Sequence, residues 1–236
     1  MNSINPLLLA SPTTRSGTTF LQRLLCSAPN TLIYGEYCAH ELFMAVQLFL
    51  LKQTQLSMGQ QYRKEQLDQV LSGAVDSWIP DLMPEPTEWL ETIRRGSFLQ
   101  FQYLKDYAIQ QSRPIWGMKM AAWNPHSLHQ IMGLFPDIRL VYLTRNAEDC
   151  LRSAKAIEMV HSEQDEQQFL QTWAYNHATT RQLIPSDKVL YIDYETLVSK
   201  PLATIQQLEE FSGARGIDPM VMKKKINNDG TYLMPV

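Results

Sequence analysis

The chain has 236 residues, of which 44% are hydrophobic and 19% charged, which predicts one globular domain and excludes a disordered or fibrous protein. Its 21 Lys and Arg residues against 24 Asp and Glu residues give a formal net charge of -3. This charge gives the protein no overall attraction to nucleic acid or to an anionic membrane, so any anion site must be built locally.

The three cysteines, Cys26, Cys38 and Cys150, form neither a CxxC pair nor a zinc-like Cys/His spacing, which fits a reducing cytoplasm. The apolar stretch 6–10 is too short for the hydrophobic region of a signal peptide, and no later segment approaches a transmembrane length. We therefore expect a soluble, unprocessed, cytoplasmic protein without a metal site.

Apolar runs typical of β-strands recur along the chain, with helical patterns between them. They cover residues 4–10, 115–118, 138–143 and 189–192, and each ends in a polar or Gly-containing turn. Strands that alternate with helices predict an α/β fold with a central parallel sheet flanked by helices. Ligands of such sheets bind beyond the carboxyl ends of the strands, so the residues that leave each strand are the candidate site.

The first run leads into a polar loop, S-P-T-T-R-S-G, that opens an amphipathic helix. In a strand, loop and helix of this kind, backbone N–H groups and the positive helix end converge on one anion. A nucleoside triphosphatase would need G-x-x-x-x-G-K-[ST], but Pro12 replaces the first Gly and Thr18 the Lys. The loop therefore predicts phosphate binding without magnesium-dependent hydrolysis, and a helix capped by Ser or Thr without a ligand is the alternative.

A mostly helical region, about residues 37–113, separates the first and second runs and contains a Pro-rich segment at 79–86. It forms either a cap that binds the second substrate or a plain cover for the sheet.

Three blocks resemble the sulfotransferases that use 3′-phosphoadenosine 5′-phosphosulfate (PAPS). The loop T-R-S-G-T-T-F-L-x-R-L-L is similar to their 5′-phosphosulfate loop, and R-L-V-Y-L-T-R-N-A-E-D-C-L-R-S to their 3′-phosphate segment. The late block V-L-Y-I-D-Y-E-T-L places Tyr194 where relatives have a tyrosine that contacts adenine. The resemblance runs from Leu7 to Phe211 apart from the helical region.

The resemblance implies a single domain over residues 1–236 with a P-loop NTPase-like fold and the helical region as an acceptor-binding insertion. It implies PAPS as cofactor, 3′,5′-ADP as product, and no metal. The residues that it assigns to the 5′-phosphosulfate are Thr14, Arg15, Ser16, Gly17, Thr18 and Thr19. Arg145 leaves a strand and Ser153 lies on the following helix, so a guanidinium and a hydroxyl can share the 3′-phosphate. An Arg145 paired with Asp149 on the surface is the alternative.

Sulfuryl transfer needs cations to neutralise the leaving oxygen and a base for the acceptor proton. Arg15 and Lys119 are the candidate cations, and a solvent-exposed strand-end lysine is the alternative for Lys119. Glu36 resembles the carboxylate base of one sulfotransferase branch, with a purely structural pairing, for example with Arg15, as its alternative. His40 and Glu41 are the other candidate bases.

The predicted reaction is transfer of the sulfuryl group from PAPS to a hydroxyl or amine of a small-molecule acceptor, as in secondary metabolism. The acidic Glu36 and Glu41 suit a cationic acceptor. Competing hypotheses are a P-loop kinase or NTPase with a degenerate phosphate loop, and a nucleotide-binding protein without catalysis. Lys223, Lys224 and Lys225 form either a second cation site or a solvated surface, Trp173 is interpreted as a core residue, and the oligomeric state is open.

Overall fold

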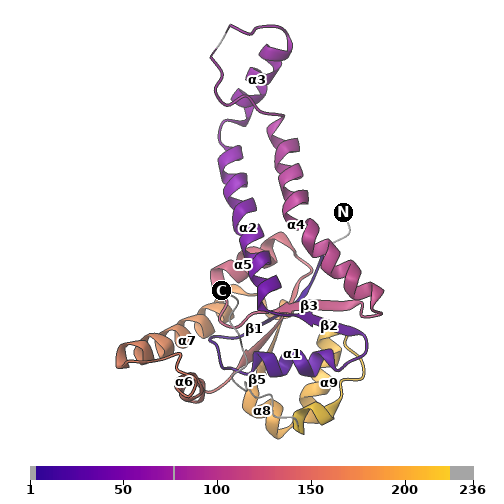
Figure 1. Ribbon diagram of the computed structural model, residues 1–236, viewed down its shortest axis with the longest axis vertical. Coiled ribbons are helices and arrows are strands. Elements are labelled where there is room, and N and C mark those ends of the chain that lie inside the picture. The colour runs from indigo at the N-terminus through magenta and orange to yellow at the C-terminus, as the bar shows by residue number, and fades with distance from the viewer. Residues whose placement is uncertain (1–3, 77, 224–236) are drawn as a thin grey trace. The chain divides into compact units, whose positions relative to one another are not determined.

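The computed structural model describes residues 4–76 and 78–223 (Figure 1). Within this part, the strands are β1 (Leu7–Ala10), β2 (Thr31–Tyr34), β3 (Ile115–Lys119), β4 (Arg139–Thr144) and β5 (Val189–Asp193). The α-helices are α1 (Thr18–Cys26), α2 (Glu36–Ser57), α3 (Gln60–Leu71), α4 (Pro86–Gln110), α5 (Pro125–Leu134), α6 (Ala147–Lys155), α7 (Glu163–Leu183), α8 (Tyr194–Ser199) and α9 (Pro201–Ser212). Two short 3-10 helices are η1 (Ser186–Lys188) and η2 (Pro219–Lys223).

The strands form one parallel sheet in the order β2-β3-β1-β4-β5, which confirms the predicted α/β fold. β1 lies at the centre, between β3 and β4, so the loop that follows it opens at the middle of the carboxyl edge. Four of the strands match the predicted apolar runs. Strand β2 was not predicted, because this four-residue edge strand alternates buried and half-buried positions and lacks a continuous apolar run.

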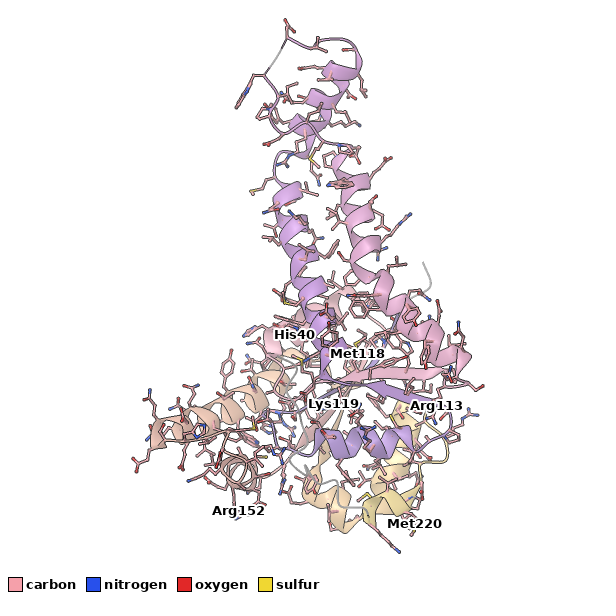
Figure 2. All side chains as sticks on the ribbon, viewed as in Figure 1. His40, Arg113, Met118, Lys119, Arg152 and Met220 are labelled. Atoms are coloured by element: carbon pink, nitrogen blue, oxygen red, sulfur yellow. The ribbon has the colours of Figure 1, made fainter. Side chains whose placement is uncertain are left out.

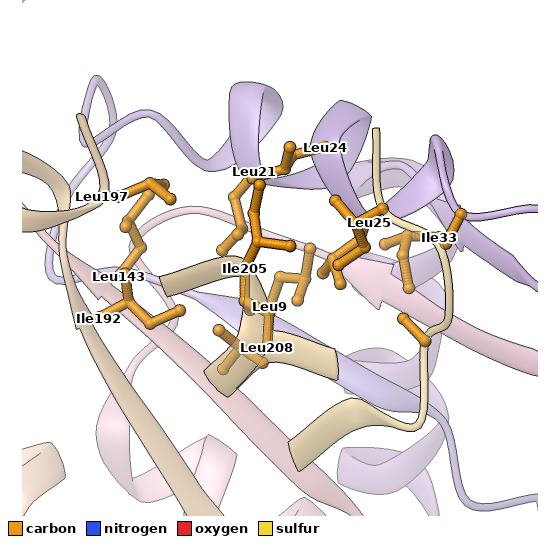
Figure 3. Close-up of a cluster of buried hydrophobic side chains, with 14 of the residues drawn as sticks. Leu9, Leu21, Leu24, Leu25, Ile33, Leu143, Ile192, Leu197, Ile205 and Leu208 are labelled. Carbon is orange, nitrogen blue, oxygen red and sulfur yellow. The ribbon is translucent and has the colours of Figure 1, made fainter. Parts of the chain in front are cut away.

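One face of the sheet carries a large hydrophobic core that includes α1, α8 and α9 (Figure 3). Leu9 of β1 and Leu143 of β4 meet Leu21 and Leu25 of α1 there, and Leu208 of α9 is fully buried beside them. Each fully buried leucine contributes about 1.5–3 kcal/mol to folding. This packing fixes the start of α1 against the sheet edge.

Helix α7 is joined to the opposite face through a buried tyrosine. The hydroxyl of Tyr142 donates to the backbone oxygen of Asn176 at 3.3 Å, and Thr180 donates to Tyr142 at 3.4 Å. Burial raises the pKa of Tyr142, so its hydroxyl stays protonated as a donor. The contact positions Asn176 at the carboxyl edge of the sheet.

The connection between α1 and β2 is held by Arg113, which is labelled in Figure 2. Its Nη1 donates to the backbone oxygens of Cys26, Ala28 and Thr31 at 3.0, 3.2 and 2.5 Å. One side chain thus satisfies three carbonyls of a turn. The turn sets the position of β2 and therefore of Glu36, which follows β2 closely.

The chain divides into two compact units, Met1–His40 with Lys105–Val236, and Glu41–Leu104. The second unit contains α3 and most of α2 and α4. Within it, the rings of Phe49 and Phe98 lie 6.1 Å apart, and Glu91 pairs with arginines one turn further on. An acceptor-binding role for the predicted helical region stays a prediction.

Replacing Gly117 with Ala should destabilise the sheet. An added Cβ would lie 2.0 Å from the backbone oxygen of Leu7, and backbone in a paired strand cannot move aside cheaply. Overpacking of this kind lowers the free energy of unfolding by about 1–3 kcal/mol, and each kcal/mol lowers Tm by about 2–4 °C for a domain of this size. Gly133→Ala is the matched control, since nothing lies within 4 Å of its Cβ position in α5. Equal Tm values for both variants in a thermal melt would contradict the prediction.

Candidate active site

The loop between β1 and α1 has a strained backbone. Arg15 has a φ of 66° and Gly17 a φ of 95°, and both values lie in the left-handed region. A Cβ on Gly17 would also come within 2.8 Å of the Tyr194 ring. Only glycine fits there, and the left-handed Arg15 is the kind of strain that concentrates at functional sites.

Hydrogen bonds fix the loop from inside and outside. The hydroxyls of Ser11 and Ser16 donate to the backbone oxygen of Thr13 at 2.7 and 2.9 Å. The side-chain amide of Asn176 donates to the backbone oxygen of Pro12 at 2.8 Å. The Cys150 sulfur contacts the Ser16 hydroxyl at 3.6 Å, and burial raises the pKa of this thiol. The loop is therefore preorganised by neutral groups.

Helix α1 begins without a side-chain cap. Gly17 occupies the N-cap position, and no side chain there accepts a hydrogen bond. Ser16 is turned back to Thr13, so the predicted alternative of a helix capped by Ser or Thr is wrong. The first-turn N–H groups of a helix have no partner within the helix. These groups, from Thr18 and Thr19 onward, are suited to an anion.

The structure brings Arg15, Arg145, Ser153 and Tyr194 together. Nε of Arg15 donates to the Ser153 hydroxyl at 3.2 Å, and Nη1 of Arg145 donates to the backbone oxygen of Arg15 at 3.2 Å. The guanidinium of Arg145 lies 4.8 Å from the centroid of the Tyr194 ring. Its Nε is buried and has no hydrogen-bond partner among the described residues.

The alternative pairing of Arg145 with Asp149 does not occur. Asp149 instead forms an ion pair with Arg152 on α6. Arg145 therefore points to the loop and keeps donor capacity for a ligand there.

Lys119 ends β3 (Figure 2) and joins two of the other predicted residues. Its Nζ donates to Oε1 of Glu36 at 2.6 Å and to the hydroxyl of Thr19 at 3.2 Å. The Lys119 side chain is only 9% exposed, whereas that of Glu36 is 55% exposed. Lys119 is thus not a solvent-exposed strand end, and Glu36 pairs with Lys119 rather than with Arg15. An ammonium has three N–H donors, so one is left for a ligand.

The remaining predicted residues differ in burial and position. Thr14 is half-buried in the loop, and Ser16 and Thr18 are buried. His40 lies one turn after Glu36 on α2 and is exposed, while Glu41 is the first residue of the second unit. Lys223 is exposed at the end of η2, and Lys224 and Lys225 lie outside the described residues.

Two residues of α7 support the site in ways that the sequence did not predict. Trp173 donates its indole N–H to the backbone oxygen of Arg145 at 3.1 Å, and Asn176 holds the loop. Trp173 is half-buried and stacks on His177 with ring centroids 4.9 Å apart, rather than being a core residue. No local motif marks either residue, because their contacts span long sequence separations.

Over residues 4–76 and 78–223, no three His, Cys, Asp or Glu side chains gather in a way that could hold a metal ion. In the same ranges, no helix is long and apolar enough to cross a membrane.

The chain is similar to known proteins in sequence pattern and in fold. A family model described as "Sulfotransferase family" matches residues 12–218. The sulfotransferase domain from the curacin biosynthetic pathway superposes with a TM-score of 0.54 at 15% identity, over 95% of this chain and 82% of that one. The sulfotransferase domain of the Synechococcus PCC 7002 olefin synthase superposes with a TM-score of 0.51 at 15% identity, over 93% of this chain and 86% of that one. A sulfotransferase from Alicyclobacillus acidocaldarius superposes with a TM-score of 0.53 at 13% identity, over 95% of this chain and 87% of that one. No curated protein matches the chain.

Proposed function

The match over residues 12–218 places this chain in the sulfotransferase family, and we propose that it transfers the sulfuryl group of PAPS to a small-molecule acceptor. The observation that carries this proposal is the convergence of Arg15, Arg145 and Ser153 beside an uncapped helix start. PAPS carries two separate anionic groups, a 5′-phosphosulfate and a 3′-phosphate. The donor set fits both of them.

Each anion has its own set of donors. The first-turn N–H groups of α1 and the loop amides suit the 5′-phosphosulfate. The buried Nε of Arg145, which lacks a protein partner among the residues described, and the Ser153 hydroxyl suit the 3′-phosphate. The Tyr194 ring meets the Phe20 ring edge to face with centroids 6.3 Å apart, and it offers an aromatic surface for the adenine of PAPS.

Glu36 and Lys119 provide the groups that the transfer requires. The exposed Glu36 carboxylate takes the proton of the acceptor hydroxyl or amine, and Lys119 holds that carboxylate in place. PAPS, when bound, would supply the sulfuryl group, which would pass from the bridging phosphate oxygen to the acceptor oxygen or nitrogen as the acceptor loses its proton to Glu36. The third N–H of Lys119, with Arg15, stabilises the negative charge that the departing phosphate oxygen gains.

The similar structures support a metabolite as acceptor. Two of them are described as domains of the curacin biosynthetic pathway and of an olefin synthase. We extend only the general class, a small molecule of secondary metabolism, to this chain.

The donor assignment predicts that 3′,5′-ADP stabilises the protein without magnesium. A ligand at 100 times its Kd adds about 2.7 kcal/mol to the folded state, or roughly 5–10 °C in Tm for a domain of this size. A thermal shift assay with 3′,5′-ADP, and with ATP and Mg²⁺ as the comparison, measures this. Stabilisation by ATP and Mg²⁺ alone would instead support the kinase or NTPase hypothesis.

A further inference from the structure

A pocket of about 380 Å³ lies beside the phosphate loop, between the segment after β3 and helix α7. Apart from Ala122, its lining is polar and consists of Asn124, Gln168, Gln171, Thr172, Tyr175 and Asn176. This volume is at the lower end of the range for small-molecule sites, so it suits a small ligand or one moiety of a larger ligand.

Two lining residues are tied directly to the phosphate loop. The backbone N–H of Ala122 donates to the backbone oxygen of Ser11 at 3.1 Å, and the Asn176 side chain donates to that of Pro12 at 2.8 Å. Ala122 also follows Lys119 by three residues. The pocket therefore borders the start of the loop proposed to hold the phosphosulfate.

The lining is hydrogen-bonding but uncharged. Every polar side chain in it is an amide, a hydroxyl or a phenol. In contrast, a pocket of about 530 Å³ beyond β4 and β5 is lined by charged groups that include Arg181, Asp193 and Glu195. An ion in the first pocket would meet hydrogen-bonding groups but no opposite charge, so the lining gives it no advantage over a neutral polar ligand.

The polar groups of the lining are already held in place. Oδ1 of Asn124 accepts from the N–H groups of His126 and Ser127, which leaves its NH₂ to donate to a ligand. Gln168 donates to the Thr172 hydroxyl at 3.2 Å. Amides and hydroxyls of this kind both donate and accept, which matches the hydroxyl groups of a polyol or sugar.

We propose that this pocket binds the acceptor and selects a neutral, hydroxyl-rich molecule, so that the enzyme sulfates oxygen. This proposal rests on the proposed sulfotransferase function and replaces the cationic acceptor expected from the sequence. The Glu36 carboxylate is paired with Lys119, so its charge is already balanced within the site.

A matched acceptor series tests the charge preference. Glucose and N-acetylglucosamine are neutral, whereas glucosamine, at a pH where its amine is protonated, is a cation and glucuronate is an anion. We expect kcat/KM with labelled PAPS to be about tenfold higher for the neutral pair, the value of about one hydrogen bond, since the lining pairs with hydroxyl groups and offers a charged group no counter-charge. A preference for glucosamine or glucuronate overturns the proposal, as does the absence of transfer to both neutral sugars by a protein that binds 3′,5′-ADP.

A pair of glutamine variants tests whether the acceptor binds in this pocket. Gln171→Ala should raise the acceptor KM by about 3- to 10-fold, the loss expected for one hydrogen bond, with kcat and 3′,5′-ADP affinity unchanged. Gln167→Ala is the matched control, because Gln167 is exposed on the same helix and does not line the pocket. Equal acceptor KM values in the two variants overturn the proposal. If the unaltered protein does not bind 3′,5′-ADP, the proposed sulfotransferase function is itself contradicted. This outcome is distinct from a failure of the acceptor proposal, in which 3′,5′-ADP still binds.

Discussion

Replacing Glu36 with Gln should lower kcat by about 10²- to 10⁴-fold, the range for loss of a general base, and leave 3′,5′-ADP binding unchanged. An amide has nearly the shape of the carboxylate, and its oxygen can still accept the hydrogen bond that Lys119 donates at 2.6 Å. It cannot take the proton of the acceptor. Because Glu36 contacts Lys119 and not Arg15 or Arg145, the donors proposed for the cofactor keep their positions. Turnover with labelled PAPS and titration with 3′,5′-ADP measure the two effects separately.

The other candidate bases provide the controls for this variant. His40→Ala and Glu41→Gln should retain most of the activity, because Glu36 already supplies the carboxylate that is paired with Lys119. Turnover of Glu36→Gln close to that of the unaltered protein would exclude Glu36 as the base. A selective loss in His40→Ala or Glu41→Gln would then identify its replacement.

The parts of the fold and site that the sequence predicted are those whose residues lie close together along the chain. Arg145 and Ser153 are eight positions apart, at the end of a strand and on the next helix, so one short segment carries both. Arg15 and Gly17 likewise lie in one loop between a strand and a helix. Carboxyl ends of parallel strands meet at one edge, which is why two such segments could be expected to converge.

The parts that were missed depend on tertiary contacts. The pairing of Lys119 with Glu36 joins residues 83 positions apart, and the bond from Asn176 to Pro12 joins residues 164 apart. Neither has a periodic or spacing signal. The uncapped start of α1 was also not predicted, because Ser16 has the right chemistry for a cap, whereas Gly17 occupies the N-cap position and the Ser16 hydroxyl donates to the backbone oxygen of Thr13.

These missed contacts explain how an acidic protein builds an anion site. Asn176 and Cys150 contact the loop through neutral groups. The loop therefore does not need ion pairs with Arg15, Arg145 and Lys119 to keep its shape. Only Lys119 has a carboxylate partner among these three in the described residues. Two guanidinium groups thus remain for the ligand.

Replacing Arg145 with Ala should weaken 3′,5′-ADP binding by roughly 30- to 1000-fold, which corresponds to about 2–4 kcal/mol for a charge-assisted contact to phosphate. The variant removes the buried Nε, the bond to the backbone of Arg15 and the contact with the Tyr194 ring. Isothermal titration of 3′,5′-ADP without magnesium measures the loss.

Two further variants separate a cofactor contact from a disturbed loop. Arg152→Ala removes an arginine from the same segment whose side chain is 77% exposed and paired with Asp149, so its affinity for 3′,5′-ADP should stay unchanged. Ser153→Ala leaves Arg145 and the loop backbone in place and should still weaken binding, by about 3- to 10-fold for one lost hydrogen bond. If Arg145→Ala binds 3′,5′-ADP as tightly as Arg152→Ala does, the 3′-phosphate does not lie at Arg145. If Arg145→Ala weakens binding but Ser153→Ala does not, the guanidinium acts through the loop rather than through a phosphate that it shares with the hydroxyl.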